Sequence, residues 1–212
     1  HVMLNRIDSA NLFLIPLDNR RQTYRYHHLF ADLLRHQLQL QYGVDAVCEL
    51  HQQASDWYHQ QGDAIATVHH ALETQDQKRV AELISYYRLK FLTTGEWFTM
   101  ARLLRQLPSE ELEARNDLMV AHAWEMLSSA QMQELVNYVD NLIPRLNDPH
   151  LIAEASIIKG YIMLWRNQPH QAIEHSQRAL QNLELSNVFL HSFALNNLGF
   201  AYRAANRLDE AL

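Results

Sequence analysis

The run Leu198-Gly199-Phe200-Ala201-Tyr202 and the later Ala211 carry the pattern that decides the fold of this chain. The same pattern occurs earlier, where Gly160 precedes Ala172 by 12 residues, the spacing that also separates Gly199 from Ala211. The two glycines are 39 residues apart, which gives the sequence an internal period of 39. Small residues at this spacing let two antiparallel helices cross closely, as in a tetratricopeptide repeat. We therefore predict a stack of helical hairpins.

The predicted repeats are longer than usual and extend further back in the chain. A period of 39 exceeds the usual period of about 34, which we assign to longer helices or to a longer loop near residues 183–187. Met163 stands where tyrosine is usual, whereas Ala179 and Leu180 fit the repeat. An earlier, degenerate repeat is expected over residues 117–146. Its predicted packing residues are Ala121, Trp124, Leu135, Val136 and Val139.

The composition favours helices along most of the chain. Only 5 glycines and 5 prolines occur among 212 residues, so strong helix breakers are rare. Residues 45–92 are predicted to form several short helices, each with one apolar stripe. Asp63, Asp76 and Asp148 are predicted to be helix N-caps. Gly95 is predicted to end a helix in the left-handed conformation, and another helix should end just before Pro144.

The beginning of the chain has a different pattern. An apolar run at residues 12–16 and alternating residues at 22–26 flank the polar, turn-prone Asp18-Asn19-Arg20-Arg21, which predicts a β-hairpin. An amphipathic helix is predicted from His27, and its apolar face must be buried against another element. A hairpin that leads into such a helix is how a winged-helix domain ends. The apolar face consists of Leu29, Phe30, Leu33, Leu34 and Leu38.

Charge and cysteine content exclude several classes of protein. The formal net charge is −6, and without a basic tract we expect no direct binding of nucleic acid by this segment. No apolar run approaches the roughly 18 residues that a membrane span needs, and no signal peptide is visible, so a cytoplasmic location is expected. The single cysteine, Cys48, excludes an internal disulfide framework and is interpreted as a small core residue.

The run Tyr24-Arg25-Tyr26-His27-His28-Leu29-Phe30-Ala31-Asp32-Leu33-Leu34 resembles the end of the winged-helix domain in MalT-like regulators. These are large ATP-binding transcriptional regulators of the signal-transduction ATPase class, with a LuxR-type DNA-binding domain. The resemblance continues through Leu50–Tyr58, Ala64–Leu72 and Gly95–Leu112. It implies a fragment in three parts: 1–42, the C-terminal part of the winged-helix domain; 43–115, a helical arm; and 116–212, the start of a repeat sensor domain. The implied fold class is all-α, an α-α superhelix after a short β-hairpin.

The resemblance also implies a nucleotide contact. In the wider ATPase class, a histidine at the start of a winged-helix helix reaches the β-phosphate of bound ADP, and His27 occupies that position. His28 stands where aspartate is common and Tyr26 where methionine is common. The alternative is a capping or core histidine. ATP or ADP is expected in the full-length protein and no cofactor in this segment, because the nucleotide-binding domain is not part of it.

The implied partners are the protein's own NTPase and winged-helix domains. A small-molecule inducer or an inhibitory protein would bind the repeat superhelix, and the activated protein would form an oligomer. The sequence assigns no residue to the inducer. Five aromatic residues are interpreted mainly as repeat packing, with some of them on the concave face: Trp124, Tyr161, Trp165, Phe200 and Tyr202.

Enzyme and metal chemistry are not expected. Adjacent residues such as His27-His28 or His69-His70 point about 100° apart on a helix and cannot chelate one ion together. The sequence has no His-Glu-x-x-His or Cys-x-x-Cys spacing, no Gly-x-Ser-x-Gly and no phosphate-binding Gly-rich loop. A stand-alone helical-repeat scaffold that binds other proteins remains the alternative function. A hydrolase would need a convergent cluster of titratable residues, which the sequence does not display.

Overall fold

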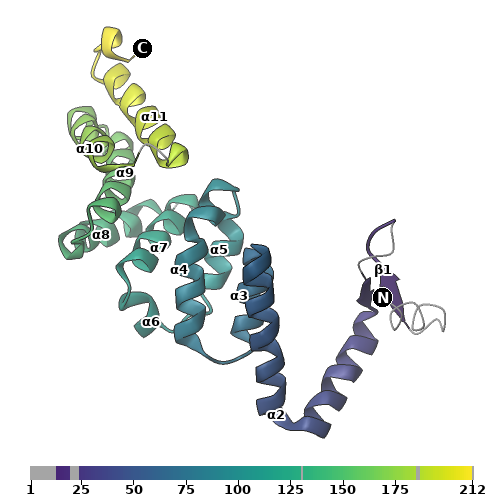
Figure 1. Ribbon diagram of the computed structural model, residues 1–212. Coiled ribbons are helices and arrows are strands. Elements are labelled where there is room, and N and C mark those ends of the chain that lie inside the picture. Colours follow the sequence, from purple (N-terminus) through teal and green to yellow (C-terminus); the bar gives the residue numbers. More distant parts are fainter. Residues whose placement is uncertain (1–12, 20–23, 130, 185–186, 212) are drawn as a thin grey trace.

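The computed structural model describes residues 13–19, 24–129, 131–184 and 187–211. Helices make up most of these residues, and one short antiparallel hairpin precedes them, as predicted (Figure 1). The elements are β1 (Leu14–Pro16), β2 (Tyr24–Tyr26), α2 (His28–Gln61), α3 (Ala64–Leu72), α4 (Gln77–Thr93), α5 (Trp97–Leu104), α6 (Ser109–Glu113), α7 (Asn116–Ser128), α8 (Met132–Leu142), the 3₁₀ turn η1 (Ile143–Arg145), α9 (Pro149–Trp165), α10 (Pro169–Asn182), α11 (Val188–Ala204) and the 3₁₀ turn η2 (Leu208–Glu210).

The hairpin packs on the first turn of α2. Leu14 lies opposite Tyr26 in the antiparallel pair, which confirms the predicted hairpin. Arg20 and Arg21 of the predicted turn lie outside the described residues. The ring of Phe30 lies 5.2 Å from that of Phe13 and 5.6 Å from that of Tyr26, measured between centroids. This aromatic cluster fixes the hairpin on the helix.

Helix α2 consists of two straight halves that meet at Gly43. Its backbone there is non-helical, with φ 81° and ψ 171°, a conformation that glycine adopts without steric penalty. The first half leads away from the rest of the molecule, whereas the second half runs beside α3 (Figure 1). The helix predicted near residue 45 is therefore the continuation of a helix that begins at His28, and the bend lies between them.

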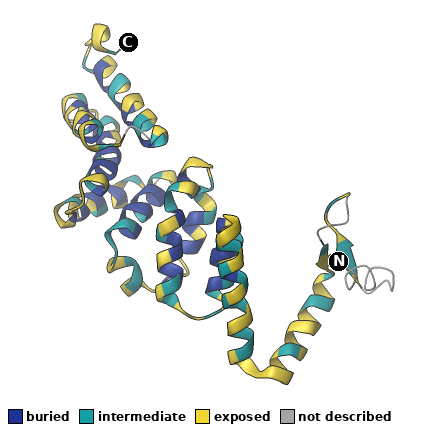
Figure 2. Cartoon of the chain, in the orientation of Figure 1, coloured by how far each residue is buried: buried dark blue, intermediate teal, exposed yellow. Residues whose placement is uncertain are grey.

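The apolar face of the first half of α2 is exposed, contrary to the sequence-based expectation. Leu29 is 68% exposed and Leu33 is 52% exposed, and Figure 2 shows exposed and half-buried residues along this segment. The hairpin packs on the side that carries Phe30, which leaves more than half of the surface of Leu29 and Leu33 exposed. Cys48 is likewise half-buried and does not lie in the core.

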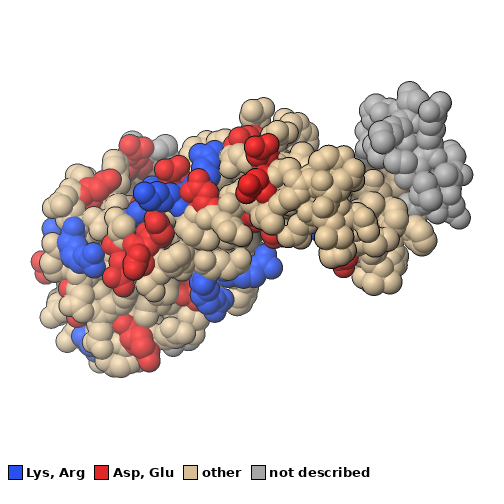
Figure 3. Space-filling view, turned by 90° about the horizontal axis from the view of Figure 1, so that it is seen from below, with Lys and Arg blue, Asp and Glu red and all other residues tan. Residues whose placement is uncertain are grey.

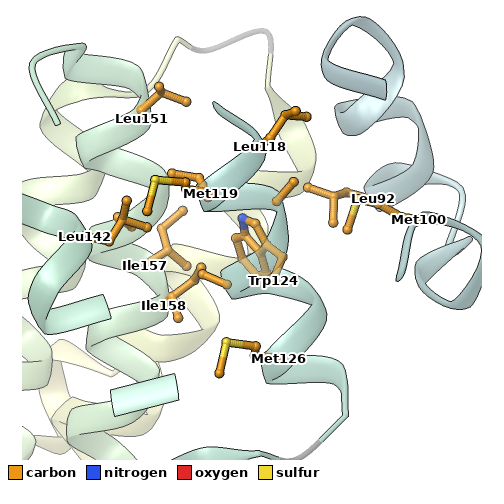
Figure 4. Close-up of a cluster of buried hydrophobic side chains, with 14 of the residues drawn as sticks. Leu92, Met100, Leu118, Met119, Trp124, Met126, Leu142, Leu151, Ile157 and Ile158 are labelled. Atoms are coloured by element: carbon orange, nitrogen blue, oxygen red, sulfur yellow. The ribbon is translucent and has the colours of Figure 1, made fainter. Parts of the chain in front are cut away.

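The remaining helices form a continuous stack in which each hairpin packs on its neighbours. Helices α7 and α8, α9 and α10, and α10 and α11 make close pairs, and α7 also packs on α4, α5 and α9. Trp124 is fully buried where these helices meet, among Met100, Leu118 and Ile158 (Figure 4). All five packing residues predicted for the degenerate repeat are buried. The predicted α-α stack is thus confirmed, including its earliest repeat.

Gly160 lies where α9 crosses α10 and α11. A Cβ atom at this position would lie 2.9 Å from Ser176 Oγ and 3.5 Å from the carbonyl oxygen of Ala172, so a larger residue would force Ser176 to shift. At Gly199 the nearest atom is the carbonyl oxygen of Ala211, at 3.8 Å. Gly160 therefore faces Ala172, and Gly199 faces Ala211, as the spacing in the sequence predicted. Helices α9 and α11 each have 17 residues, which favours longer helices as the reason for the long period.

The predicted helix ends are confirmed as well. The carboxylates of Asp63, Asp76 and Asp148 each accept a backbone N–H bond at the start of the next helix, at 2.8 to 3.0 Å. Gly95 has φ 75°, as expected for a helix that ends in a left-handed residue. Helix α8 ends two residues before Pro144, which lies in the turn η1.

Substituting Gly160 by alanine tests the close crossing. We expect Gly160→Ala to lower the free energy of unfolding by about 1–3 kcal/mol relative to Gly199→Ala, because only the first added methyl group meets a buried atom closer than a normal contact. The measurement is urea unfolding followed by circular dichroism. Ser176 Oγ has no hydrogen-bond partner, so adding Ser176→Ala to Gly160→Ala should recover most of the loss. Equal stability of the two glycine variants would contradict the close crossing.

Candidate functional site

His27 lies at the junction between the hairpin and α2. Its backbone N–H donates to the carbonyl oxygen of Phe13 at 2.7 Å, and its own carbonyl oxygen accepts from Phe30 and Ala31 at 3.0 and 2.9 Å. The side chain makes no capping hydrogen bond, and it is half-buried. The backbone of His27 thus anchors the junction, while the imidazole is neither a helix cap nor a core residue.

The chemistry available at this junction is that of an imidazole beside a helix start. The ring of His27 lies 4.3 Å from the ring of His28, between centroids. Backbone N–H groups of the first turn of α2 give the helix start a partial positive charge, which favours an anion. The predicted contact of His27 with an ADP phosphate stays a prediction, because the nucleotide would lie against a domain that this chain does not include.

The face of the junction that is visible in Figure 3 carries few charges. On the face shown in Figure 3, acidic and basic side chains are interspersed over the helical stack, whereas few charges lie on the part of the chain next to the grey residues. Exposed apolar side chains occupy this part instead: Phe13, Leu17, Tyr26, Leu29, Leu33 and Leu34. Such a surface is suited to contact with another protein domain.

At the other end of the described chain, aromatic side chains line a hollow between α9 and α11. Its volume is about 420 Å³, and Tyr161, Trp165 and Phe200 contribute to its wall. Arg203 lies over the ring of Phe200, 5.7 Å from its centroid. Trp165 and Phe200 are more than half exposed. Of the five aromatic residues assigned to packing, Trp124 and Tyr202 are buried, and the other three are exposed.

A buried ion pair connects α4 to α9. Arg88 on α4 donates through Nη1 to both carboxylate oxygens of Glu154 on α9, at 2.9 and 2.7 Å. Their side chains are only 12% and 3% exposed. Nearby, the hydroxyl of Ser85 on α4 donates to Asp117 on α7. Polar contacts therefore tie α4 to both α7 and α9.

Metal binding finds no support in the described part of the chain, where no three histidine, cysteine, aspartate or glutamate side chains are placed to hold one ion. Nδ1 of His51 does lie 3.0 Å from Nδ1 of His70. Burial, and then the nearby His51, lower the pKa of His70. This hydrogen bond joins α2 to α3. Among the described residues, no helix is long and apolar enough to cross a membrane.

Comparison with known sequences gives the same family as the motif pattern. Residues 1–46 match the model of the MalT winged helix domain. The whole chain is similar to the HTH-type transcriptional regulator MalT of Vibrio parahaemolyticus, with 27% identity over 99% of this chain and 24% of the relative. The corresponding protein of Vibrio campbellii is 25% identical over the same shares. The chain is similar to MalT regulators along nearly its whole length. It spans about a quarter of the length of these MalT relatives.

One solved structure supports the fold of this MalT-like chain. The crystal structure of MamA protein superposes with a TM-score of 0.54 over 78% of this chain and 86% of that one. The sequence identity is 15%, so this likeness concerns the fold alone. The family model matches only the winged-helix segment, whereas the superposition with this structure also covers residues beyond that segment.

Sequence reasoning missed the ion pair of the MalT-like chain. Arg88 and Glu154 are 66 positions apart, and each looks like an ordinary polar residue of a helix. The one signal that could have found Glu154 is its surroundings, since it stands in the largely apolar segment Leu151–Ile158. A charged residue within an apolar helix that is buried on all sides needs a partner.

Breaking this pair should destabilise the stack strongly. We expect Glu154→Gln to lower the free energy of unfolding by about 3 kcal/mol, because it leaves the Arg88 guanidinium buried without its counter-charge. Asp32→Asn removes an exposed partner, since Asp32 pairs with Arg35 where both side chains are more than 60% exposed, and should cost under about 0.5 kcal/mol. Urea unfolding measures both. Arg88→Met combined with Glu154→Leu should be closer to wild type than Glu154→Gln, and similar losses for Glu154→Gln and Asp32→Asn would argue against the buried pair.

Proposed function

We propose that this chain is the regulatory part of an ATP-dependent, LuxR-family transcriptional activator, in which it transmits inducer or partner binding to an NTPase switch. The observation that carries the proposal is the similarity to MalT regulators over 99% of the chain. The arrangement of the described residues supports it, because a surface suited to a domain contact lies at one end and an aromatic hollow at the other, with a continuous packed stack between them.

In this proposal the two ends have different partners. The exposed face of α2, with Leu29 and Leu33, docks on the protein's own NTPase and winged-helix domains. The repeat stack receives a small-molecule inducer or an inhibitory protein, for which Tyr161, Trp165 and Phe200 are the most accessible aromatic residues. Binding there biases the contacts at the other end, and the released form oligomerises. The stack transmits the effect of binding from one end to the other because the polar contacts of Arg88 and Ser85 join α4, α7 and α9.

His27 contributes the nucleotide contact in this scheme. Its imidazole is free of any capping hydrogen bond, so it is available to a phosphate oxygen presented by the NTPase domain. We infer that the contact holds ADP in the resting state. ATP and ADP are cofactors of the full-length protein, and the segment itself performs no catalysis.

The test is His27→Ala in the full-length regulator. We expect ADP to dissociate at least about tenfold faster, as for the loss of one hydrogen bond to a charged group, and basal transcription to rise. The readouts are the release of labelled ADP and a reporter assay. His36→Ala, an exposed histidine of the same helix, is the matched control and should behave as wild type. Unchanged ADP release in His27→Ala would refute the assigned contact.

A stand-alone scaffold that binds other proteins is the second candidate. The exposed aromatic residues Tyr161, Trp165 and Phe200 favour it, because protein-binding surfaces are enriched in such side chains. The flanking gene sequence distinguishes the two. A Gly-x-x-x-x-Gly-Lys motif upstream and a helix-turn-helix segment downstream are expected for the regulator, and their joint absence would leave the scaffold.

A further inference from the structure

A pocket that none of the roles above uses lies between the end of α5, the short α6 and the hairpin of α7 and α8. Its volume is about 500 Å³, within the range of small-molecule sites. Side chains of Leu104, Leu107 and Leu112 form one wall, and those of Met119 and Leu142 form another. The pocket therefore offers apolar surface beside polar side chains and has the size of a small organic molecule.

Two arginines line this pocket without a carboxylate partner among the described residues. Arg105 makes no ion pair there, and Arg145 donates only to the backbone carbonyl oxygen of Glu113, at 3.4 Å. The side chain of Glu113 is the one acidic group in the wall. Among the lining residues two guanidinium groups stand against one carboxylate, and Glu125, which contacts His122, is a further acidic neighbour.

Hydrogen-bonding groups complete the wall. His122 on α7 lines the pocket and is held by Glu125, with 3.3 Å between Nδ1 and the carboxylate. The rings of His122 and Tyr138 meet edge to face at 5.2 Å, and the Tyr138 hydroxyl donates to the carbonyl oxygen of Met119 at 3.3 Å. Burial raises the pKa of Tyr138 to about 12, so this hydroxyl keeps its proton at neutral pH.

We propose that this pocket binds a small organic anion, a carboxylate or phosphate on an apolar body, with Arg105 and Arg145 pairing its charge. The apolar walls receive the body, and the guanidinium groups bind the charged end through charge-assisted hydrogen bonds. Polyanions such as nucleic acids are disfavoured, because the overall negative charge of the chain repels them. The pocket lies where the predicted arm meets the predicted repeats, so an occupant would contact both.

His122 offers an internal reporter of binding. Burial lowers the pKa of His122 and Glu125 opposes this shift, while the positive charge of Arg105 lowers the pKa further. An anion placed beside Arg105 neutralises that charge, so it must raise the pKa of His122. The ring Cε1 proton of His122 in the NMR spectrum therefore follows occupancy of this pocket and not of another surface.

The experiment uses 2-naphthoate as probe, with neutral 2-naphthamide of nearly the same shape as its control. We expect naphthoate to shift the His122 signal saturably and to raise its titration midpoint, and naphthamide to bind at least about tenfold more weakly. Inorganic phosphate, which lacks the apolar body, should bind more weakly than naphthoate. Equal binding of naphthoate and naphthamide, or no shift of His122 with any probe, would overturn the proposal.

The variants separate this pocket from other basic surface. Arg105→Gln should weaken naphthoate binding about tenfold, and Arg145→Gln should weaken it similarly. Arg178→Gln on α10, an exposed arginine outside the pocket, should leave the affinity unchanged. Arg105 has no ion-pair partner to lose among the described residues, so Arg105→Gln is expected to have the same melting temperature as wild type. An unchanged affinity in both pocket variants counts against the site.

The proposal does not depend on the regulator role, since ADP release in His27→Ala tests a different part of the chain.

Discussion

The packing around Trp124 is the constraint on which the folded part of this chain depends. A helical hairpin buries only one side of each helix, and the other side must meet a neighbouring hairpin. The indole of Trp124 fills the place where α4, α5, α7 and α11 approach one another, with ring contacts to Trp97 and Phe193 at 5.8 and 5.1 Å. Its Nε1 group is buried without a hydrogen-bond partner. The apolar contacts of the ring, which connect neighbouring hairpins, offset the free-energy cost of burying this N–H group.

The ion pair of Arg88 and Glu154 acts on this core in a different way. Taking two charges out of water costs about as much as their attraction returns, so a buried pair adds little net stability. The pair specifies how α9 lies relative to α4, because any other placement of the two helices would bury one charge without its partner. Dispersion and burial therefore hold the helices together, while this pair and Gly160 determine how they are aligned.

Much of the architecture could be predicted from the sequence, because its signals are local. The capping aspartates and the stop at Pro144 each act within one or two turns of a helix, and Gly160 and Ala172 lie on consecutive helices. The exposure of Leu29 and Leu33 could not be predicted, since periodicity shows that a face is apolar and does not show whether anything covers it. The pocket between Arg105 and Arg145 was missed for a related reason, as its walls come from separate helices whose approach depends on the packing of the whole stack.

Gly43 gives the beginning of the chain a mechanical property. Residues 28–42 form an arm about 22 Å long at a rise of about 1.5 Å per residue, and the hairpin sits at its tip. A change of roughly 10° in the backbone at this one glycine would move the tip by about 4 Å on that geometry. No close-packed core resists such a change, because the first half of α2 is largely exposed. The position of the hairpin relative to the stack is thus set by the backbone angles of one glycine, Gly43.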